Sequence, residues 1–279
     1  MKILRAIARL WLASSALACS SAATGSDVPD NGSEIVGGAR DTRHPSVAIV
    51  QWAAIQEGRP VAFPMCSATL VASEFVLTAA HCVVPADKRT TNANYVAYFG
   101  TTPKRAAPKD RYAVKRAFAH PKYSPHVFGA YDVAVLELER PVSGVPPVPI
   151  ASAIPNLVGR TVTHVGWGTS VSSDAEHKSG AGTKRWVALP VLAQHTQTLE
   201  TGNGRSGICN GDSGGPALLD VHGTEVVVGV HSYIDDNDTC AQSGFSFRPD
   251  TADAFLSKYL PPSAFRDVAA DFARDGDPN

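Results

Sequence analysis

The sequence predicts an all-β fold, and two features of it carry this prediction. Short apolar runs recur along the chain, and they are separated by turn-forming residues, with 23 glycines and 20 prolines among 279 residues. Short strands with frequent turns are typical of antiparallel barrels and sandwiches. At this length the chain could hold one large domain or two small ones, and two closely packed β-barrels fit it.

The predicted strands form two sets on either side of a proline-rich connector. Residues 140–150 carry four prolines and predict an extended linking segment. Residues 169–183 are polar, rich in serine and glycine, and predict a loop within the second set. The clearest strands before the connector are 46–52, 68–71, 75–78, 95–99 and 133–138, and those after it are 161–165, 185–189, 216–219 and 225–232.

The C-terminal part of the chain predicts helix. Residues 251–260 have helical spacing and are followed by Pro261 and Pro262, which stop a helix. In the extension 261–279, apolar residues from Phe265 to Phe272 also recur at helical spacing. An extra surface helix is the preferred interpretation of this extension, and a helix that docks on a partner is the alternative.

The N-terminus predicts export. Three basic residues precede a short apolar run that ends in small residues, so residues 1–18 are expected to be a secretory signal peptide. The run is too short to span a bilayer comfortably. Residues 19–34 are polar and predict a flexible spacer or propeptide.

Five cysteines leave one unpaired if the others form disulfides. Cys19 directly follows the signal run, where it could become a lipidated N-terminus; simple cleavage after Ala23, which discards it, is the alternative. The other four cysteines suit disulfides in an oxidising compartment. No Cys-x-x-Cys pair supports a metal site, and a net charge of -1 gives no argument for nucleic acid.

A candidate nucleophile lies in Cys209-Asn-Gly-Asp-Ser-Gly-Gly-Pro216. Glycines around Ser213 allow a sharp turn and let backbone N–H groups point at one spot, where negative charge could be held. A serine hydroxyl is a weak nucleophile and needs a base and an orienting acid. His81, at the end of an apolar run, and Asp132, which precedes an apolar run, are the candidates.

Four segments together resemble the chymotrypsin-like (trypsin-type) serine peptidase family: Ile35-Val-Gly-Gly38, Thr78-Ala-Ala-His-Cys82, 131–138 and 209–216. The resemblance extends over 35–260. It implies two six-stranded antiparallel β-barrels at about 35–145 and 146–250, followed by a helix at 251–260.

The resemblance also implies the roles of residues. In the family template, Ser213 attacks the scissile carbonyl, His81 takes its proton, and Asp132 holds the imidazole tautomer. The N–H groups of Gly211 and Ser213 form the oxyanion hole, and Ser232 supports the aspartate. The implied disulfides are Cys66–Cys82 and Cys209–Cys240.

Activation is expected to follow cleavage before Ile35. In the family the new N-terminal ammonium pairs with the aspartate before the nucleophile, which is Asp212 here. The residue before the junction is Glu34 rather than Arg or Lys. A glutamate-cleaving protease or self-cleavage must therefore be supposed.

The resemblance gives the specificity pocket its residues. Gly207 occupies the pocket floor, where an aspartate would select Arg and Lys, and Ile208 follows it. The walls are the segments Ser232-Tyr233-Ile234 and Ser243-Gly244, and Ile234 should narrow the mouth. Small or medium aliphatic side chains are the predicted choice. The acidic cluster Asp235, Asp236 and Asp238 is interpreted as a solvated loop, with attraction of basic substrate residues as the alternative.

Two functions other than peptide hydrolysis are alternatives for this sequence. Gly211-Asp-Ser-Gly-Gly215 also satisfies the G-x-S-x-G elbow of α/β-hydrolases, but that fold requires a helix after the serine and a downstream histidine. A non-catalytic binding or adhesion module with the same fold is the remaining alternative. The prediction is a monomeric serine endopeptidase that acts on protein or peptide substrates and needs no metal or organic cofactor. It is expected to be exported, either to a bacterial periplasm or outer membrane as a lipoprotein or as a secreted protein.

Overall fold

The computed structural model describes residues 35–56, 59–84, 94–101, 103, 106–127, 129–168, 182–235 and 239–274. The expected signal peptide and spacer, with Cys19 and Glu34, lie outside these ranges. So do Asp236, Asp238 and most of the predicted 169–183 loop.

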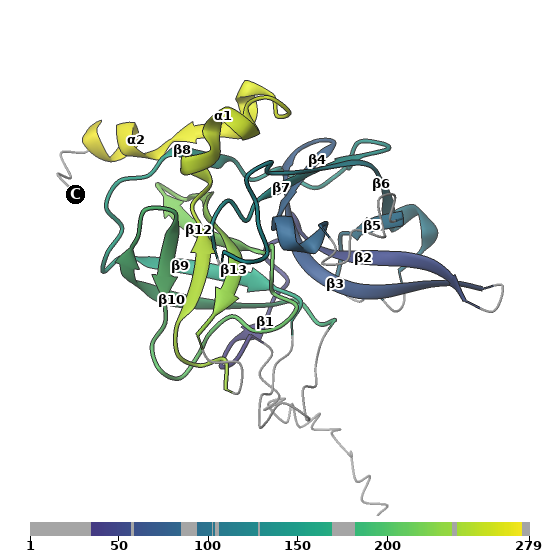
Figure 1. Ribbon diagram of the computed structural model, residues 1–279, viewed down its shortest axis with the longest axis horizontal. Coiled ribbons are helices and arrows are strands. Elements are labelled where there is room, and N and C mark those ends of the chain that lie inside the picture. Colours follow the sequence, from purple (N-terminus) through teal and green to yellow (C-terminus); the bar gives the residue numbers. More distant parts are fainter. Residues whose placement is uncertain are drawn as a thin grey trace, which may run out of the picture. The chain divides into compact units, whose positions relative to one another are not determined.

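The first barrel closes from six antiparallel strands in the order β2-β3-β4-β7-β6-β5 (Figure 1). Every residue of β7 is buried, because the run Ala134–Leu138 has neighbours on both sides. The strands are β2 (Val47–Gln56), β3 (Arg59–Ala72), β4 (Phe75–Thr78), β5 (Asn94–Tyr98), β6 (Arg111–Ala119) and β7 (Ala134–Leu138).

The second barrel runs β12-β9-β10-β11-β14-β13 and closes through antiparallel pairing of β12 with β13. Two closed six-stranded antiparallel barrels therefore confirm the predicted fold class. Three further strands join its sheet: β1 (Ala39–Arg40) pairs with β10, while β8 and β15 run parallel to their neighbours. The remaining strands are β8 (Ile150–Ala153), β9 (Thr161–Gly166), β10 (Arg185–Gln194), β11 (Thr198–Thr201), β12 (Pro216–Val221), β13 (Thr224–Ile234), β14 (Gly244–Phe247) and β15 (Phe265–Asp267).

The largest hydrophobic cluster contains residues from both barrels. Leu70 and Leu136 enter it from the first barrel, and Trp167 and Phe247 enter it from the second. All four are almost completely buried. Burying an aliphatic or aromatic side chain of this size contributes about 1.5–3 kcal/mol, so the shared cluster favours one arrangement of the two halves.

The C-terminal helix is shorter than predicted. Pro249–Ala252 form the 3₁₀ helix η4 and Asp253–Leu256 form α1, so regular helix ends before the prolines at 261 and 262. The other 3₁₀ helices within the described ranges are η1 (Ala80–Cys82), η3 (Pro108–Asp110) and η5 (Pro262–Ala264). None of the described helices is long and apolar enough to cross a membrane.

The extension after Pro261 packs on its own chain. Phe265 was predicted to be helical but lies in β15, which pairs with β8. Helix α2 (Val268–Arg274) follows, and Figure 1 shows it beside β8. Val268 is fully buried and Phe272 packs against the second-barrel core, so these apolar residues face the second barrel.

Candidate active site

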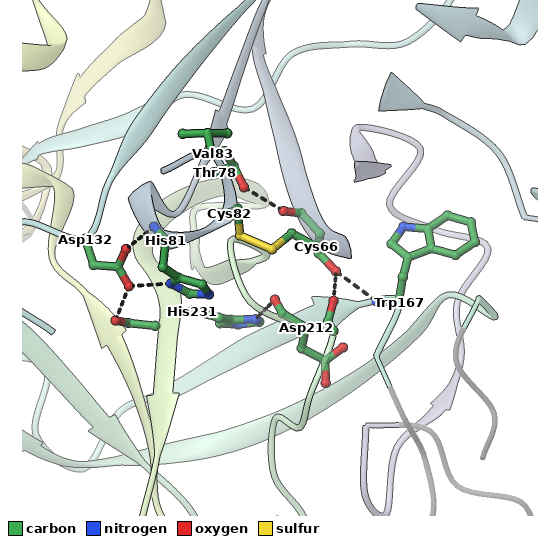
Figure 2. Close-up of a disulfide and its surroundings, with 12 residues drawn as sticks. Cys66, Thr78, His81, Cys82, Val83, Asp132, Trp167, Asp212 and His231 are labelled. Atoms are coloured by element: carbon green, nitrogen blue, oxygen red, sulfur yellow. Dashed lines mark hydrogen bonds and ion pairs between the residues drawn. A yellow bond between two sulfur atoms is a disulfide. The ribbon is translucent and has the colours of Figure 1, made fainter. Parts of the chain in front are cut away.

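Asp132 is held by three hydrogen bonds at the entry to β7. Its carboxylate accepts from the His81 backbone N–H at 3.0 Å, from His81 Nδ1 at 2.8 Å and from Ser232 Oγ at 2.5 Å (Figure 2). The side chain is only 4% exposed. Burial by itself raises the pKa of Asp132, but the hydrogen bonds and the nearby His81 outweigh burial, and the pKa lies below its ordinary value. Asp132 is therefore an ionised acceptor.

His81 lies in η1, directly after β4, and its side chain is 31% exposed. Because the Asp132 carboxylate can only accept, Nδ1 of His81 is the donor in their bond. In the neutral ring, Nε2 then carries a lone pair and can accept a proton. This is the tautomer that a general base requires.

A disulfide and one backbone hydrogen bond bring His81 and Ser213 into the same neighbourhood. Cys82, next to His81, is bonded to Cys66. The next residue, Ser67, donates its N–H to the Ser213 carbonyl at 2.8 Å. The two sulfurs and a His81 ring nitrogen lie within 4.8 Å of one another. These sulfurs are disulfide-bonded and supply no thiolate for a metal ion.

Ser213 is half-buried in a loop that contains glycine at two positions with a positive φ angle. Gly211 and Gly214 have φ angles of +96° and +78°. A Cβ on Gly214 would lie 2.1 Å from Thr78 Oγ1, so a larger residue would be forced against β4. Among the described residues, no hydrogen bond joins Ser213 to His81. Such contacts are often long in unliganded sites and tighten when substrate binds.

Asp212 is fully buried and accepts from two backbone N–H groups, those of Gly168 and Cys209, each at 2.8 Å. A Cβ on Gly166 or Gly168 would overlap this carboxylate. Ile35 is also fully buried, in a small cluster with Val187 and Leu189. The adjacent Val36 pairs with Gly207, two residues before Cys209.

A pocket of about 200 Å³ opens beside Ser213. Four of the predicted specificity residues line it: Ile208, Ser232, Tyr233 and Ile234. The predicted nucleophile Ser213 also lines it, as do three residues that were not predicted for the pocket and that flank the predicted ones in the chain: Cys209, Asn210 and His231.

Gly207 and Gly244, also predicted for this pocket, are not among its lining residues. A Cβ on Gly244 would lie 2.6 Å from Ile208 Cγ1, so the Ile208 side chain packs against that glycine. A Cβ on Gly207 would lie 2.3 Å from the Cys240 carbonyl. Cys240 is bonded to Cys209, and this disulfide fastens the two neighbouring segments.

A second pocket of about 200 Å³ is lined by His81. It shares Ser232 and Tyr233 with the first pocket, so the two adjoin along β13. Val127, at its edge, is 54% exposed. Asp132 also lines this pocket, and the remaining residues come from a segment that the motifs did not mark: Tyr123, Ser124, Pro125 and Gly129.

Several known proteins are similar to this chain in sequence. Over 220 residues the chain is 29% identical to CLIP domain-containing serine protease B15 of Anopheles gambiae. This match covers 65% of this chain and 58% of that protein. It is 30% identical over 185 residues to Serine protease filzig of Drosophila melanogaster, covering 55% of this chain and 10% of that protein. It is 26% identical over 230 residues to Chymotrypsin-like elastase family member 1 of Felis catus, and this match covers 75% of this chain and 82% of that protein.

The chain thus spans less than two thirds of the first two relatives. All three organisms are animals, and the bacterial origin expected from the Cys19 signal stays a prediction. The family model described as Trypsin matches residues 35–252. Because this match covers more than half of the sequence, the chain belongs to the trypsin family of chymotrypsin-like serine proteases.

Proposed function

We propose that the protein is a serine endopeptidase whose catalytic residues are Ser213, His81 and Asp132. The observation that carries this proposal is the bond from His81 Nδ1 to a buried, ionised Asp132, because it leaves the Nε2 lone pair as a base. The two pockets share Ser232 and Tyr233, and they give a peptide room beside Ser213 in one and beside His81 in the other.

In this mechanism, Nε2 of His81 removes the proton from Ser213 Oγ while Oγ bonds to the carbonyl carbon of the scissile peptide. The carbonyl oxygen becomes an oxyanion. His81 then gives its proton to the leaving amine, and the acyl-enzyme is hydrolysed by water in the same sequence of steps. Asp132 stays ionised and stabilises the imidazolium.

The oxyanion is proposed to bind the N–H groups of Gly211 and Ser213. Within the described ranges neither of these N–H groups donates a hydrogen bond, while the neighbouring N–H groups of Asp212, Gly214 and Gly215 all do. Two unpaired donors beside a nucleophile suit a developing negative charge.

Activation is proposed to need cleavage before Ile35 and an ion pair between its new ammonium and Asp212. Support comes from the complete burial of both residues, since a buried carboxylate favours a cationic partner. The precursor is proposed to be exported, because two disulfides suit an oxidising compartment. Lipidation at Cys19 is the proposed anchor if the protein remains at a membrane.

Small or medium aliphatic substrate residues are the proposed specificity. Ile208 and Ile234 contribute branched apolar side chains to the pocket, and none of its described lining residues is acidic. Arg and Lys would therefore find no counter-charge there, and large aromatic rings would meet the two isoleucines.

The test is a peptide-hydrolysis assay on a precursor that carries a site-specific protease sequence directly before Ile35. After cutting, wild type should hydrolyse substrates with Ala or Val before the cleaved bond faster than those with Arg, Lys or Phe, and Ser213→Ala should be inactive. If the cut wild type hydrolyses none of these, the non-catalytic binding module becomes the better account.

A further inference from the structure

Ser67 lies at the junction between the two halves of the candidate active site. It is fully buried on β3 and follows Cys66, whose disulfide to Cys82 fixes the loop of His81 (Figure 2). Its own carbonyl accepts from Thr78 Oγ1 at 2.9 Å, within the first barrel. Its N–H and its hydroxyl both bond to segments after residue 160.

The hydroxyl of Ser67 takes part in a directed chain of hydrogen bonds. The Trp167 N–H donates to Ser67 Oγ at 3.0 Å, and the hydroxyl donates to the Gly211 carbonyl at 3.0 Å. Donor and acceptor capacities are both used, so the hydroxyl has one orientation. Hydrogen bonds in such a chain strengthen one another in a buried setting.

Gly211 is the residue whose orientation matters for catalysis. Its φ of +96° is available to glycine and to few other residues, so its backbone has more alternatives than most. Ser67 Oγ fixes its carbonyl, and the Asp212 N–H on the same peptide donates to Cys209 at 3.0 Å. Both polar groups of the Gly211–Asp212 peptide are therefore held. The Gly211 N–H belongs to the preceding peptide, and its direction is restricted through the Gly211 Cα that the two peptides share.

We propose that Ser67 is a positioning residue for the oxyanion hole: its hydroxyl holds Gly211 in the conformation that aims the Gly211 N–H at the substrate oxyanion. The inference rests on the proposed function. Ser67 touches neither substrate nor reacting atoms and acts only through Gly211.

Ser67→Ala removes the hydroxyl and should lower kcat roughly 10-fold or more with KM changed little, since losing an entire oxyanion donor costs about 10²–10³ in kcat. Ser67→Thr retains a hydroxyl and should recover most of the rate. The matched control is Ser246→Ala, because Ser246 is also fully buried and its hydroxyl has no hydrogen-bond partner in the described part of the chain.

Two further readouts separate positioning from a general structural defect. A peptide boronic acid adds Ser213 Oγ to boron and places a boron-bound oxygen in the hole, so its inhibition constant should rise in Ser67→Ala by the same factor by which kcat falls. The pH at which kcat/KM is half-maximal should stay at the wild-type value, because the bond between His81 and Asp132 is untouched.

An unchanged kcat and boronate affinity in folded Ser67→Ala overturn the inference and leave the proposed function standing. A loss that appears in KM, shifts the pH midpoint or recurs in Ser246→Ala also overturns it. If Ser67→Ala does not fold, Ser67→Gly removes the same hydroxyl, and failure of both to fold assigns Ser67 a purely structural role. A wild type without activity overturns the proposed function and this inference together.

Discussion

His164 Nδ1 lies 2.9 Å from His231 Nε2, and both imidazoles are completely buried. His231 Nδ1 is 3.0 Å from the Asp212 carbonyl, which can only accept, so His231 carries its proton on Nδ1. Its Nε2 therefore accepts from His164 Nδ1. Complete burial lowers the pKa of both imidazoles, so both rings are neutral at neutral pH. The pair supports the residue next to the proposed nucleophile.

This pair predicts a loss of stability in weak acid. Burial lowers the pKa of His231 from 6.5 to about 4 and lowers the pKa of His164 well below its ordinary value. As the pH falls, the unfolded chain binds protons at these histidines before the folded chain does. The contribution of the buried neutral pair to the free energy of unfolding is therefore intact above pH 6.5 and declines as the pH falls toward 4. For His231 alone the loss should be roughly 3 kcal/mol, measured as the free energy of unfolding in urea across this range.

The control for this prediction is a pair of variants. His164→Val/His231→Val should flatten the pH dependence between 6.5 and 4, whereas His126→Ala, at an exposed histidine, should not. His44 does not interfere, because its bonds to Asp41 and Glu225 outweigh burial and raise its pKa to about 9, so its stabilising effect is complete below pH 6.5. If the free energy of unfolding of the double variant falls between pH 6.5 and 4 as steeply as that of wild type, the acid sensitivity does not come from this histidine pair.

Ser232→Ala should weaken catalysis through Asp132. The variant loses the 2.5 Å hydrogen bond from Ser232 Oγ, and hydrogen bonds to charged groups contribute about 1.5–3 kcal/mol. We expect kcat/KM to fall roughly 10-fold or more, by the conversion of 1.4 kcal/mol to a factor of ten. Thr251→Val, which removes the 2.7 Å hydrogen bond from the exposed Thr251 Oγ1 to the Arg248 carbonyl, is the control and should retain full activity.

Ile234→Gly should widen the specificity pocket. The branched side chain of Ile234 lines the pocket beside Ser213, so removing it should raise kcat/KM for substrates with Phe or Tyr before the cleaved bond relative to Ala. The expected change in this ratio is about 10-fold or more. Leu192→Gly, at an exposed position on β10, should leave the ratio unchanged. An unchanged ratio in Ile234→Gly argues against this pocket as the specificity site.

Gly214→Ala and Gly223→Ala form a test of the nucleophile loop. Both glycines have a φ of +78°, but an added Cβ meets Thr78, Ser67 and Ala79 at Gly214 and nothing within 4 Å at Gly223. The backbone strain alone should cost roughly 1–2 kcal/mol in each. Gly214→Ala should lower the free energy of unfolding in urea by more than this and should abolish activity. Equal losses of stability in the two variants would show that the close contacts at Gly214 do not contribute.

Strands could be predicted from the sequence where a local pattern of residues determines them. Strand β4 was predicted with its observed bounds, because three apolar residues and a threonine are bounded by turn residues on one side and the His81 loop on the other. Strand β6 was not recognised: Arg111, Lys115 and Arg116 interrupt its apolar pattern, and most of its residues are at least partly exposed. Its pairing with β5 and β7 depends on segments distant in the sequence.

The candidate site divides in the same way. Motifs pointed to Ser213, His81 and Asp132, because each lies in a distinctive local sequence. The packing of Ile208 against Gly244 and the burial of His231 beside His164 arise from contacts between strands, and no local pattern indicates them. Ser67 looks like an ordinary strand residue until its hydroxyl is seen between Trp167 and Gly211.

The most direct test of the central claim is intact-mass and peptide mass spectrometry after treatment with a fluorophosphonate, which bonds covalently to an activated serine hydroxyl. A chain beginning at Ile35 should gain one label, on Ser213, and Ser213→Ala and His81→Ala should gain none. A correctly folded chain beginning at Ile35 that stays unlabelled, or that is labelled on another serine, would contradict this claim.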